Sequence, residues 1–315
     1  MKYFRSYPFV MQLILFLLMT FTFLSCAGFV LLSLLTKLTG FTPVQLTGIT
    51  PASPLSLIYS AVTVQGIQSI FIFLLPSLVF AYLAHPRPAA YLGLRKPGKM
   101  IQLPLVILLM VGASPLLMFI EHLVSLIDFG KEVKAAQLAN ENTMTAFMTM
   151  PDVTAFLRVF IVMAIIPAVG EEMFFRGIMM RFARKRSKSM LFPVLFSAAI
   201  FAYAHSNIYG YLSIFLAGML LAVIYNLTGS LWCSIAGHMF FNGTQVVLSY
   251  LGNISPAVKS LMAGNSVPYY LVISGAVVFT ASLYLLLKNK TPLPPNWSDD
   301  FTHEELIIFK AESMK

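Results

Sequence analysis

The sequence predicts an all-α membrane protein, a polytopic transmembrane helical bundle of about eight helices. Three observations lead to this fold class: the composition, the length of the apolar runs and the placement of the basic residues. Of the 315 residues, 58% are hydrophobic and only 10% are charged, whereas a soluble domain carries about 25% charged residues. The apolar runs reach the length of roughly 20 residues that a helix needs to cross a bilayer core.

About eight apolar runs succeed one another along the chain, and each is interpreted as one span. The predicted spans cover residues 9–35, 56–84, 101–123, 153–181, 190–206, 210–228, 231–251 and 268–287. The first run follows Lys2 and Arg5 and begins like a secretory signal, but it continues through Leu32. This is longer than the apolar core of a typical signal peptide, so we expect an uncleaved first helix.

Basic residues predict the orientation of the bundle. The net charge is +9, and the basic residues gather before the first span, between spans two and three, between spans four and five, and after span eight. With eight spans all four positions fall on one side, and the positive-inside rule places both termini in the cytoplasm. We therefore expect a multi-pass protein of the plasma (inner) membrane, with membrane lipid as a partner and no nucleic acid.

The fourth span contains two adjacent acidic residues, Glu171 and Glu172, in an otherwise apolar run. A carboxylate at membrane depth is costly unless it is paired or lines a wet cavity. Arg176 lies four residues after Glu172, so the two share a helix face and can form an ion pair. Glu171 is rotated by about 100° and is expected to point into a cavity, and Pro167 is expected to kink the helix. The alternative is a purely structural pair that joins helices.

Two later spans contribute further polar residues. The fifth ends in His205, and the seventh carries His238 and Asn242 four residues apart on one face. At about 1.5 Å per residue, Glu171, His205, His238 and Asn242 lie about 15, 22, 12 and 18 Å from the predicted cytoplasmic ends of their spans. The four depths agree within the error of the predicted span boundaries, so one shared cavity near mid-membrane is geometrically possible, and we predict such a cavity. Taken singly, a packed or helix-joining polar contact is the more common role for such residues.

The polar residues stand in three motifs that resemble those of the CPBP family, the CAAX-protease and bacteriocin-processing family of intramembrane proteases. The motifs are Glu171-Glu172-Met173-Phe174-Phe175-Arg176, then Phe201-Ala202-Tyr203-Ala204-His205, and then His238-Met239-Phe240-Phe241-Asn242. Each motif is loose by itself, whereas all three in this order are fairly specific. The resemblance covers about residues 150–250, and the remainder agrees only in being apolar or polar.

The resemblance implies an all-helical intramembrane endopeptidase. Its substrate would be a membrane-anchored protein or peptide, in CAAX-type tail processing, peptide maturation or immunity. Glu171 would correspond to the acid that activates water, assisted by His205. His238 would complete the water or metal site, Asn242 would hydrogen-bond the developing oxyanion, and the ion pair of the fourth span would hold the geometry.

The chemistry of these residues leaves the role of a metal open. Peptide hydrolysis needs a base and donors aimed at the oxyanion. Glu171, His205 and His238 would also suit Zn²⁺ or another divalent metal, since three N/O ligands and a water are typical of catalytic zinc. No HExxH motif demands zinc, so a metal-free glutamate mechanism stands beside the metal mechanism. The two cysteines, Cys26 and Cys233, lie outside the motifs, and neither a disulfide framework nor a Cys-based metal site is expected.

This interpretation divides the chain into four parts. Residues 1–150 hold the N-terminal transmembrane helices and their connecting loops, 151–252 the CPBP-like transmembrane catalytic core, 253–290 the last transmembrane helix, and 291–315 a polar cytoplasmic tail. Two other functions would keep the fold without proteolysis: a membrane scaffold, or a transporter that uses the buried polar residues as an ion relay. The complete motif set favours the protease, and the lack of an evident internal repeat weighs against a transporter.

Overall fold

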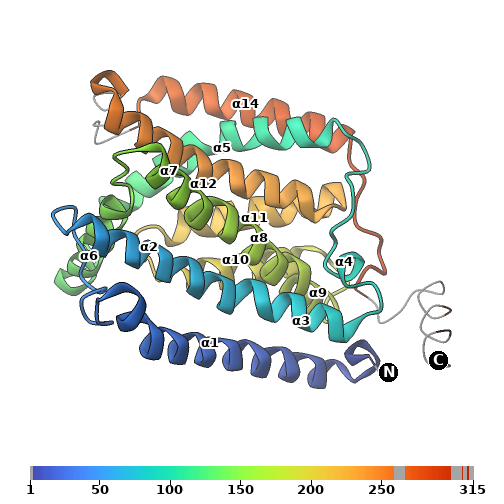
Figure 1. Ribbon diagram of the computed structural model, residues 1–315. Helices are drawn as coiled ribbons and strands as arrows, with labels where there is room; N and C mark the ends of the chain where they lie inside the picture. The colour runs from blue at the N-terminus through green and yellow to red at the C-terminus, as the bar shows by residue number, and fades with distance from the viewer. Residues whose placement is uncertain (1–2, 259–266, 299–306, 308–310, 312–315) are drawn as a thin grey trace.

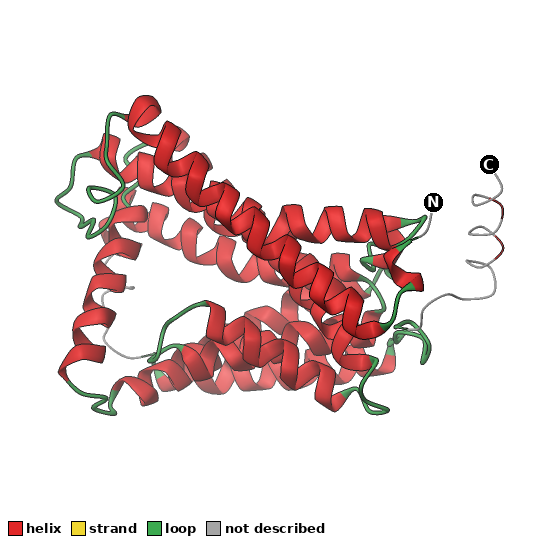
Figure 2. Ribbon diagram, turned by 90° about the horizontal axis from the view of Figure 1, so that it is seen from below, coloured by secondary structure: helices red, strands yellow, loops and turns green. Residues whose placement is uncertain are grey.

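The computed structural model describes residues 3–258 and 267–298, with residues 307 and 311, as a bundle of helices (Figure 1). These residues contain no strand, and loops join one helix to the next (Figure 2). The predicted fold class, an all-α polytopic bundle, is confirmed. Most of the predicted polar tail beyond residue 298 lies outside the described residues. The elements are η1 (Phe4–Ser6), α1 (Phe9–Thr39), α2 (Leu55–Ser69), η2 (Ile70–Leu74), α3 (Leu75–Ala84), α4 (Pro88–Tyr91), α5 (Gln102–Ser125), α6 (Lys131–Phe147), α7 (Val153–Phe160), η3 (Ile161–Ile165), α8 (Ile166–Glu171), η4 (Glu172–Met179), α9 (Met180–Arg184), α10 (Leu191–Ala204), α11 (Tyr211–Thr228), α12 (Leu231–Ile254) and α14 (Tyr269–Lys288).

Among the described residues, 6 helical elements are long and apolar enough to cross a membrane. They are Phe9–Leu31, Leu55–Ala84, Gln102–Ser125, Val153–Arg184, Tyr211–Thr228 and Tyr269–Lys288. The other two predicted spans are also helices. However, α10 has only 14 residues, about 21 Å at 1.5 Å per residue, and α12 carries Ser234, His238 and Asn242 at a spacing of four. The predicted count of eight is therefore approximate.

Two of the spans contain a π-helical segment shortly before a proline. The segment η2 precedes Pro76, and η3 precedes Pro167. Proline has no backbone N–H, and its ring collides with the carbonyl four residues earlier, so a regular α-helix is disrupted there. The wider π turn accommodates this disruption. At Pro167, where the sequence predicts a kink, the helix thus departs from α geometry through η3.

The connection between α5 and α7 contains a helix that the sequence analysis treated as a loop. The helix α6 has 17 residues and low hydrophobicity. Its sequence is rich in Ala, Lys, Glu, Gln and Leu, which are strong helix formers. Gln137 donates to Glu141 one turn later at 2.9 Å, a contact that supports an exposed helix. Hydropathy misses such a segment because its stability comes from propensity and not from an apolar face.

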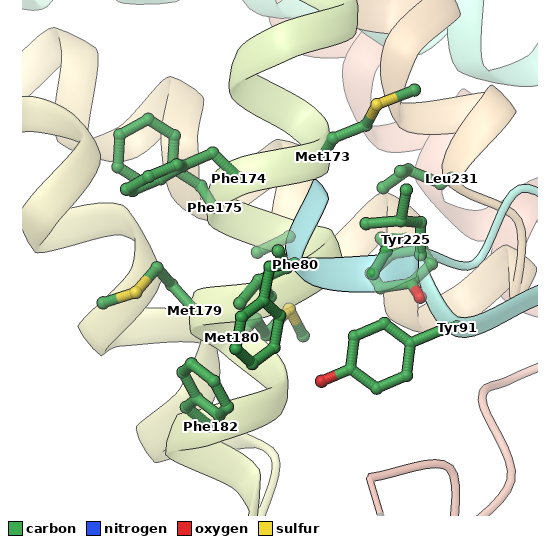
Figure 3. Packing of buried hydrophobic residues seen from close by; sticks show 14 of the residues in the cluster. Phe80, Tyr91, Met173, Phe174, Phe175, Met179, Met180, Phe182, Tyr225 and Leu231 are labelled. Carbon is green, nitrogen blue, oxygen red and sulfur yellow. The ribbon is translucent and has the colours of Figure 1, made fainter. Parts of the chain in front are cut away.

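Aromatic packing fixes the end of the fourth span that carries the basic residues. Phe16 of α1 lies 5.2 Å from Phe80 of α3 and 5.8 Å from Phe182 of α9, measured between ring centroids. Phe80 and Phe182 are 5.7 Å apart in an edge-to-face arrangement, the geometry that aromatic pairs prefer. Figure 3 shows Phe80, Met180 and Phe182 together in this core. The core holds α1, α3 and α9 against one another.

The basic segments meet at one end of the bundle. One cavity there is lined by Arg5, Arg95 and Arg181, together with Leu293, Pro294, Asn296 and Trp297. The start of α1 and the end of α14 also lie at this end (Figure 1). The arrangement agrees with an orientation in which the basic clusters share one side of the membrane.

We expect a reporter fused after Lys290 to be active only as a cytoplasmic reporter, because the positive-inside rule assigns the basic end to the cytoplasm. A fusion at Gly130, in the α5–α6 connection, is the matched control and should read out on the opposite side. Reporter activity outside the cytoplasm for the fusion after Lys290 would contradict the predicted orientation.

Candidate active site

The candidate active site lies in the middle of the bundle, where α8 and η4 meet α12 (Figure 1). The acidic pair of the fourth span spans the junction of α8 and η4, since Glu171 ends α8 and Glu172 begins η4. The facing helix α12 supplies Ser234, His238 and Asn242. A π-helical segment such as η4, which begins at the second acid, is frequent at functional sites, because it changes the direction in which successive side chains point.

Glu172 is the centre of a buried network. Arg176 Nη1 donates to Glu172 Oε1 at 2.6 Å, and both side chains are 0% exposed. Ser234 Oγ donates to the other carboxylate oxygen, Oε2, at 2.6 Å. The ion pair that the spacing predicted is thus present. Burying both charges is tolerable because each finds a partner of opposite charge and further hydrogen bonds.

Arg176 also joins two other helices to this network. Its Nη2 donates to the backbone carbonyl of Gly218 at 2.7 Å, and its guanidinium lies 4.6 Å from the ring centroid of Phe201. A Cβ atom on Gly218 would lie 2.9 Å from a ring carbon of Phe201, so glycine permits the close contact of α11 with α10. One arginine therefore connects η4, α10 and α11.

His238 lies between the two acids. Its Nδ1 is 2.9 Å from Glu172 Oε1, and because a carboxylate only accepts, this assigns the proton to Nδ1. Its Nε2 faces Glu171 Oε2 at 3.9 Å. That oxygen is buried and has no hydrogen-bond partner among the described residues. The separation is too long for a direct hydrogen bond, and it is one that a single bridging water can span.

Asn242 lies one turn beyond His238 and bonds to the backbone of the fourth span. Its Nδ2 donates to the carbonyl of Met163 at 3.2 Å. In an α-helix that carbonyl would accept from the N–H of residue 167, which is proline and has none. The Asn242 amide therefore supplies a donor that Pro167 lacks. An amide nitrogen carries two N–H groups, so one donor of Asn242 remains for another acceptor.

The structure does not bring His205 into contact with Glu171 or His238. His205 directly follows α10, its side chain is exposed, and its Nδ1 lies 2.8 Å from the carbonyl of Phe201. The ring of Phe201 packs against both histidines, with its centroid 4.7 Å from that of His205 and 5.8 Å from that of His238. The next residue, Ser206, has a left-handed φ of 51° that ends the helix there.

The arrangement of these side chains does not fit a three-ligand metal site. Glu171 and His238 turn one oxygen and one nitrogen toward each other, but His205 stands apart from them. Among the described residues, no group of three or more His, Cys, Asp or Glu side chains is placed to hold a metal ion. The metal set Glu171, His205 and His238 therefore stays a prediction, and the chemistry below is derived from the side chains alone.

Three residues of the network were missed by the sequence analysis. Ser234 repeats the spacing of four that links His238 to Asn242, and this signal would have found it. Gly218 contributes only a backbone carbonyl, for which the sequence carries no signal. Phe201 was quoted within a motif, but its contact with His238 depends on how α10 packs against α12.

Comparison with known proteins agrees with the location of this site. Residues 153–244 match the family model described as Rce1-like, type II CAAX prenyl endopeptidase Rce1-like. The matched segment contains all three motifs, so the resemblance noted from the sequence is confirmed for this part of the chain. The match supports an intramembrane endopeptidase in general, carried by a multi-pass helical membrane protein. No curated protein and no solved structure matches the chain.

Proposed function

We propose that this protein is an intramembrane endopeptidase that hydrolyses a peptide bond in a membrane-anchored protein or peptide with water activated by Glu171. One observation carries the proposal. The buried, unpartnered Oε2 of Glu171 lies 3.9 Å from Nε2 of His238, and the other ring nitrogen of that histidine is held by Glu172. A base and an acceptor nitrogen thus face each other at a distance that suits one water.

In the proposed reaction, Glu171 takes a proton from this water while its oxygen attacks the carbonyl carbon of the scissile peptide bond. His238 Nε2 accepts a hydrogen bond from the other O–H of the water, and this contact orients the lone pair of the water oxygen toward the carbonyl carbon. The negative charge that develops on the carbonyl oxygen is stabilised by the remaining N–H of Asn242. As the C–N bond breaks, the proton held by Glu171 passes to the leaving amine, and an acid and an amine result.

The other motif residues are proposed to position or assist Glu171 and His238. The Glu172–Arg176 pair keeps a fixed negative charge beside Nδ1 of His238, which holds the ring in one tautomer, as hydrogen-bonded carboxylates do for functional histidines. His205 is proposed to assist Glu171, and this role requires its ring to leave the carbonyl of Phe201 and to approach Glu171 when the substrate binds. If His205 never reaches Glu171, the alternative of a non-proteolytic scaffold or transporter-like protein gains support.

The proposed substrates are membrane-anchored proteins or peptides, in CAAX-type tail processing, peptide maturation or immunity. Comparative proteomics of membrane-anchored peptides from cells with the wild-type protein and with the Glu171→Gln variant tests this proposal. We expect uncleaved precursors to accumulate with the variant. Identical peptide profiles at equal protein levels would support the scaffold or the transporter instead.

Replacing Asn242 with Ala should lower turnover by about 10²–10³, the usual cost of one lost oxyanion donor. Asn253→Ala is the matched control, because Asn253 stands on the same helix and its Nδ2 also donates to a backbone carbonyl, that of Met148, at 3.0 Å. The rates are measured on a reconstituted membrane-anchored peptide. Equal losses in the two variants would show that Asn242 acts only by holding the backbone.

A further inference from the structure

We propose that the basic end of the bundle binds an anion that carries a phosphate group, in the cavity between Arg95, Arg181, Tyr225 and Trp297. The cavity has a volume of about 70 Å³. Arg181 follows Glu171 by ten residues in the same helical element, which places it about 15 Å along the axis. The proposed site is therefore separate from the candidate active site and does not depend on the proposed protease activity.

The cavity is lined by positive charge. Three arginines, Arg5, Arg95 and Arg181, line the cavity, and no acidic side chain is among its described lining residues. The salt bridges between described residues include neither Arg95 nor Arg181. Arg181 is only 4% exposed, so its charge is taken out of water, and no carboxylate of the described residues forms a salt bridge with it. A buried cation of this kind is unfavourable unless an anion compensates it.

Among the described residues, the groups that contact the guanidinium of Arg181 are neutral. Its guanidinium lies 4.4 Å from the ring centroid of Tyr91 and 4.6 Å from that of Trp297. Its two terminal nitrogens donate to the backbone carbonyls of Trp297 and Tyr91. Cation–π contacts and carbonyl acceptors orient a guanidinium, but they leave its positive charge in place for a ligand.

Three buried polar groups at the cavity can donate hydrogen bonds that no described residue accepts. Nε of Arg181, the hydroxyl of Tyr225 and Nε1 of Trp297 are buried, and none has a hydrogen-bond partner among the described residues. Figure 3 shows the hydroxyl of Tyr225 turned toward the side of the cluster where Tyr91 lies. Two of these groups can only donate, and a hydroxyl can donate as well. Buried polar groups are normally satisfied, so a ligand with several acceptor oxygens fits them.

Backbone contacts around the cavity hold these donors in place. Gly93 has a φ of +82°, and a Cβ atom on it would collide with the hydroxyl of Tyr225. The carbonyl of Gly93 accepts from the N–H of Leu231 at 2.9 Å, and the N–H of Leu293 donates to the carbonyl of Asn226 at 3.0 Å. These bonds tie the loop after α4 and the segment after α14 to α11 and α12. The cavity is therefore preformed.

The volume of the cavity, the charge of Arg181 and the buried donors together indicate the class of ligand. A water needs about 10–15 Å³ of such space, so the cavity has room for several waters or for one small ion. Waters would satisfy the donors but would not balance the charge of Arg181. A phosphate group does both, since its oxygens accept several charge-assisted hydrogen bonds and arginine matches their geometry. The group can belong to free phosphate or to the headgroup of a membrane lipid.

The test is the binding of inorganic phosphate to the full-length protein in neutral detergent, followed by calorimetry. Tyr225→Phe removes only a hydroxyl that has no hydrogen-bond partner among the described residues, so the fold should stay as stable as in the wild type. We expect this variant to bind phosphate about tenfold or more weakly, the value of a hydrogen bond to a charged group. Equal phosphate binding by a stable Tyr225→Phe variant would overturn the proposal.

A second pair of variants tests the charge. Arg95 is exposed and lines the cavity, whereas Lys96 is an exposed neighbour that does not. Arg95→Gln should weaken phosphate binding by about two- to fivefold, as expected for an exposed charge pair, and Lys96→Gln should leave it unchanged. If the two variants weaken binding equally, the effect comes from the general charge of the surface and the site is refuted.

A further experiment with lipid vesicles distinguishes a lipid headgroup from free phosphate as the ligand. The thermal stability of the protein is compared in phosphatidylcholine vesicles with and without phosphatidic acid, for the wild type and for Tyr225→Phe. Stabilisation by phosphatidic acid that the variant loses identifies a lipid headgroup as the ligand. Binding of inorganic phosphate without any effect of phosphatidic acid identifies a soluble ligand. The absence of both effects would refute the site.

Discussion

Glu171→Gln is expected to abolish cleavage by the purified protein and to leave its fold intact. Glutamine keeps the shape of the side chain but cannot accept a proton from water. In the structure Oε2 of Glu171 has no hydrogen-bond partner among the described residues, so the substitution breaks no bond of the protein at that oxygen. A positioned base contributes about 10²–10⁴ to the rate. The cleavage of a reconstituted membrane-anchored peptide measures the loss.

Glu121→Gln is the matched control for this experiment. Glu121 is also a glutamate of an apolar span, in α5, and it accepts from Ser213 Oγ at 3.5 Å. It takes no part in the network around His238, and the control should therefore cleave at the wild-type rate. Full cleavage by Glu171→Gln would refute the catalytic assignment, and equal loss in both variants would point to a general effect of charge in the membrane.

Arg176→Ala should destabilise the protein by about 3–5 kcal/mol, because it leaves the carboxylate of Glu172 buried without its cation. The variant loses the 2.6 Å ion pair and the 2.7 Å bond to the carbonyl of Gly218. It also loses the contact with the ring of Phe201. The shift of the denaturation midpoint in detergent measures this effect, and activity should fall with stability.

Two further variants distinguish the ion pair from the bulk of the side chain. The double variant Glu172→Gln/Arg176→Met removes both charges and should recover part of the lost stability, since no charge is left unpaired. Arg158→Ala removes a half-buried arginine of the same helical element that stacks on Tyr59 at 4.5 Å, and it should cost about 1 kcal/mol or less. An Arg176→Ala protein as stable as the wild type would show that the pair has no structural role.

Local properties of the chain explain why much of the fold was predictable. Hydropathy and the length of each run depend on neighbouring residues only, and 6 predicted spans correspond to helices that can cross a membrane. The Glu172–Arg176 pair follows from helix periodicity, and so does the different direction of Glu171. The helix α6 was not predicted, since a polar helix has no hydropathy signal, whereas α10 was predicted within two residues of its ends.

The sequence by itself determined the fold class, the apolar helices and the Glu172–Arg176 ion pair, because each of these depends on the residues of one helix. Only the tertiary structure decided which of these residues meet. It placed His238 next to both Glu171 and Glu172, packed Phe201 against His238 and His205, and bound Asn242 to the carbonyl of Met163. Depth along a helix follows from residue number, whereas the direction of a side chain toward another helix depends on packing angles and on π-helical segments that shift the register.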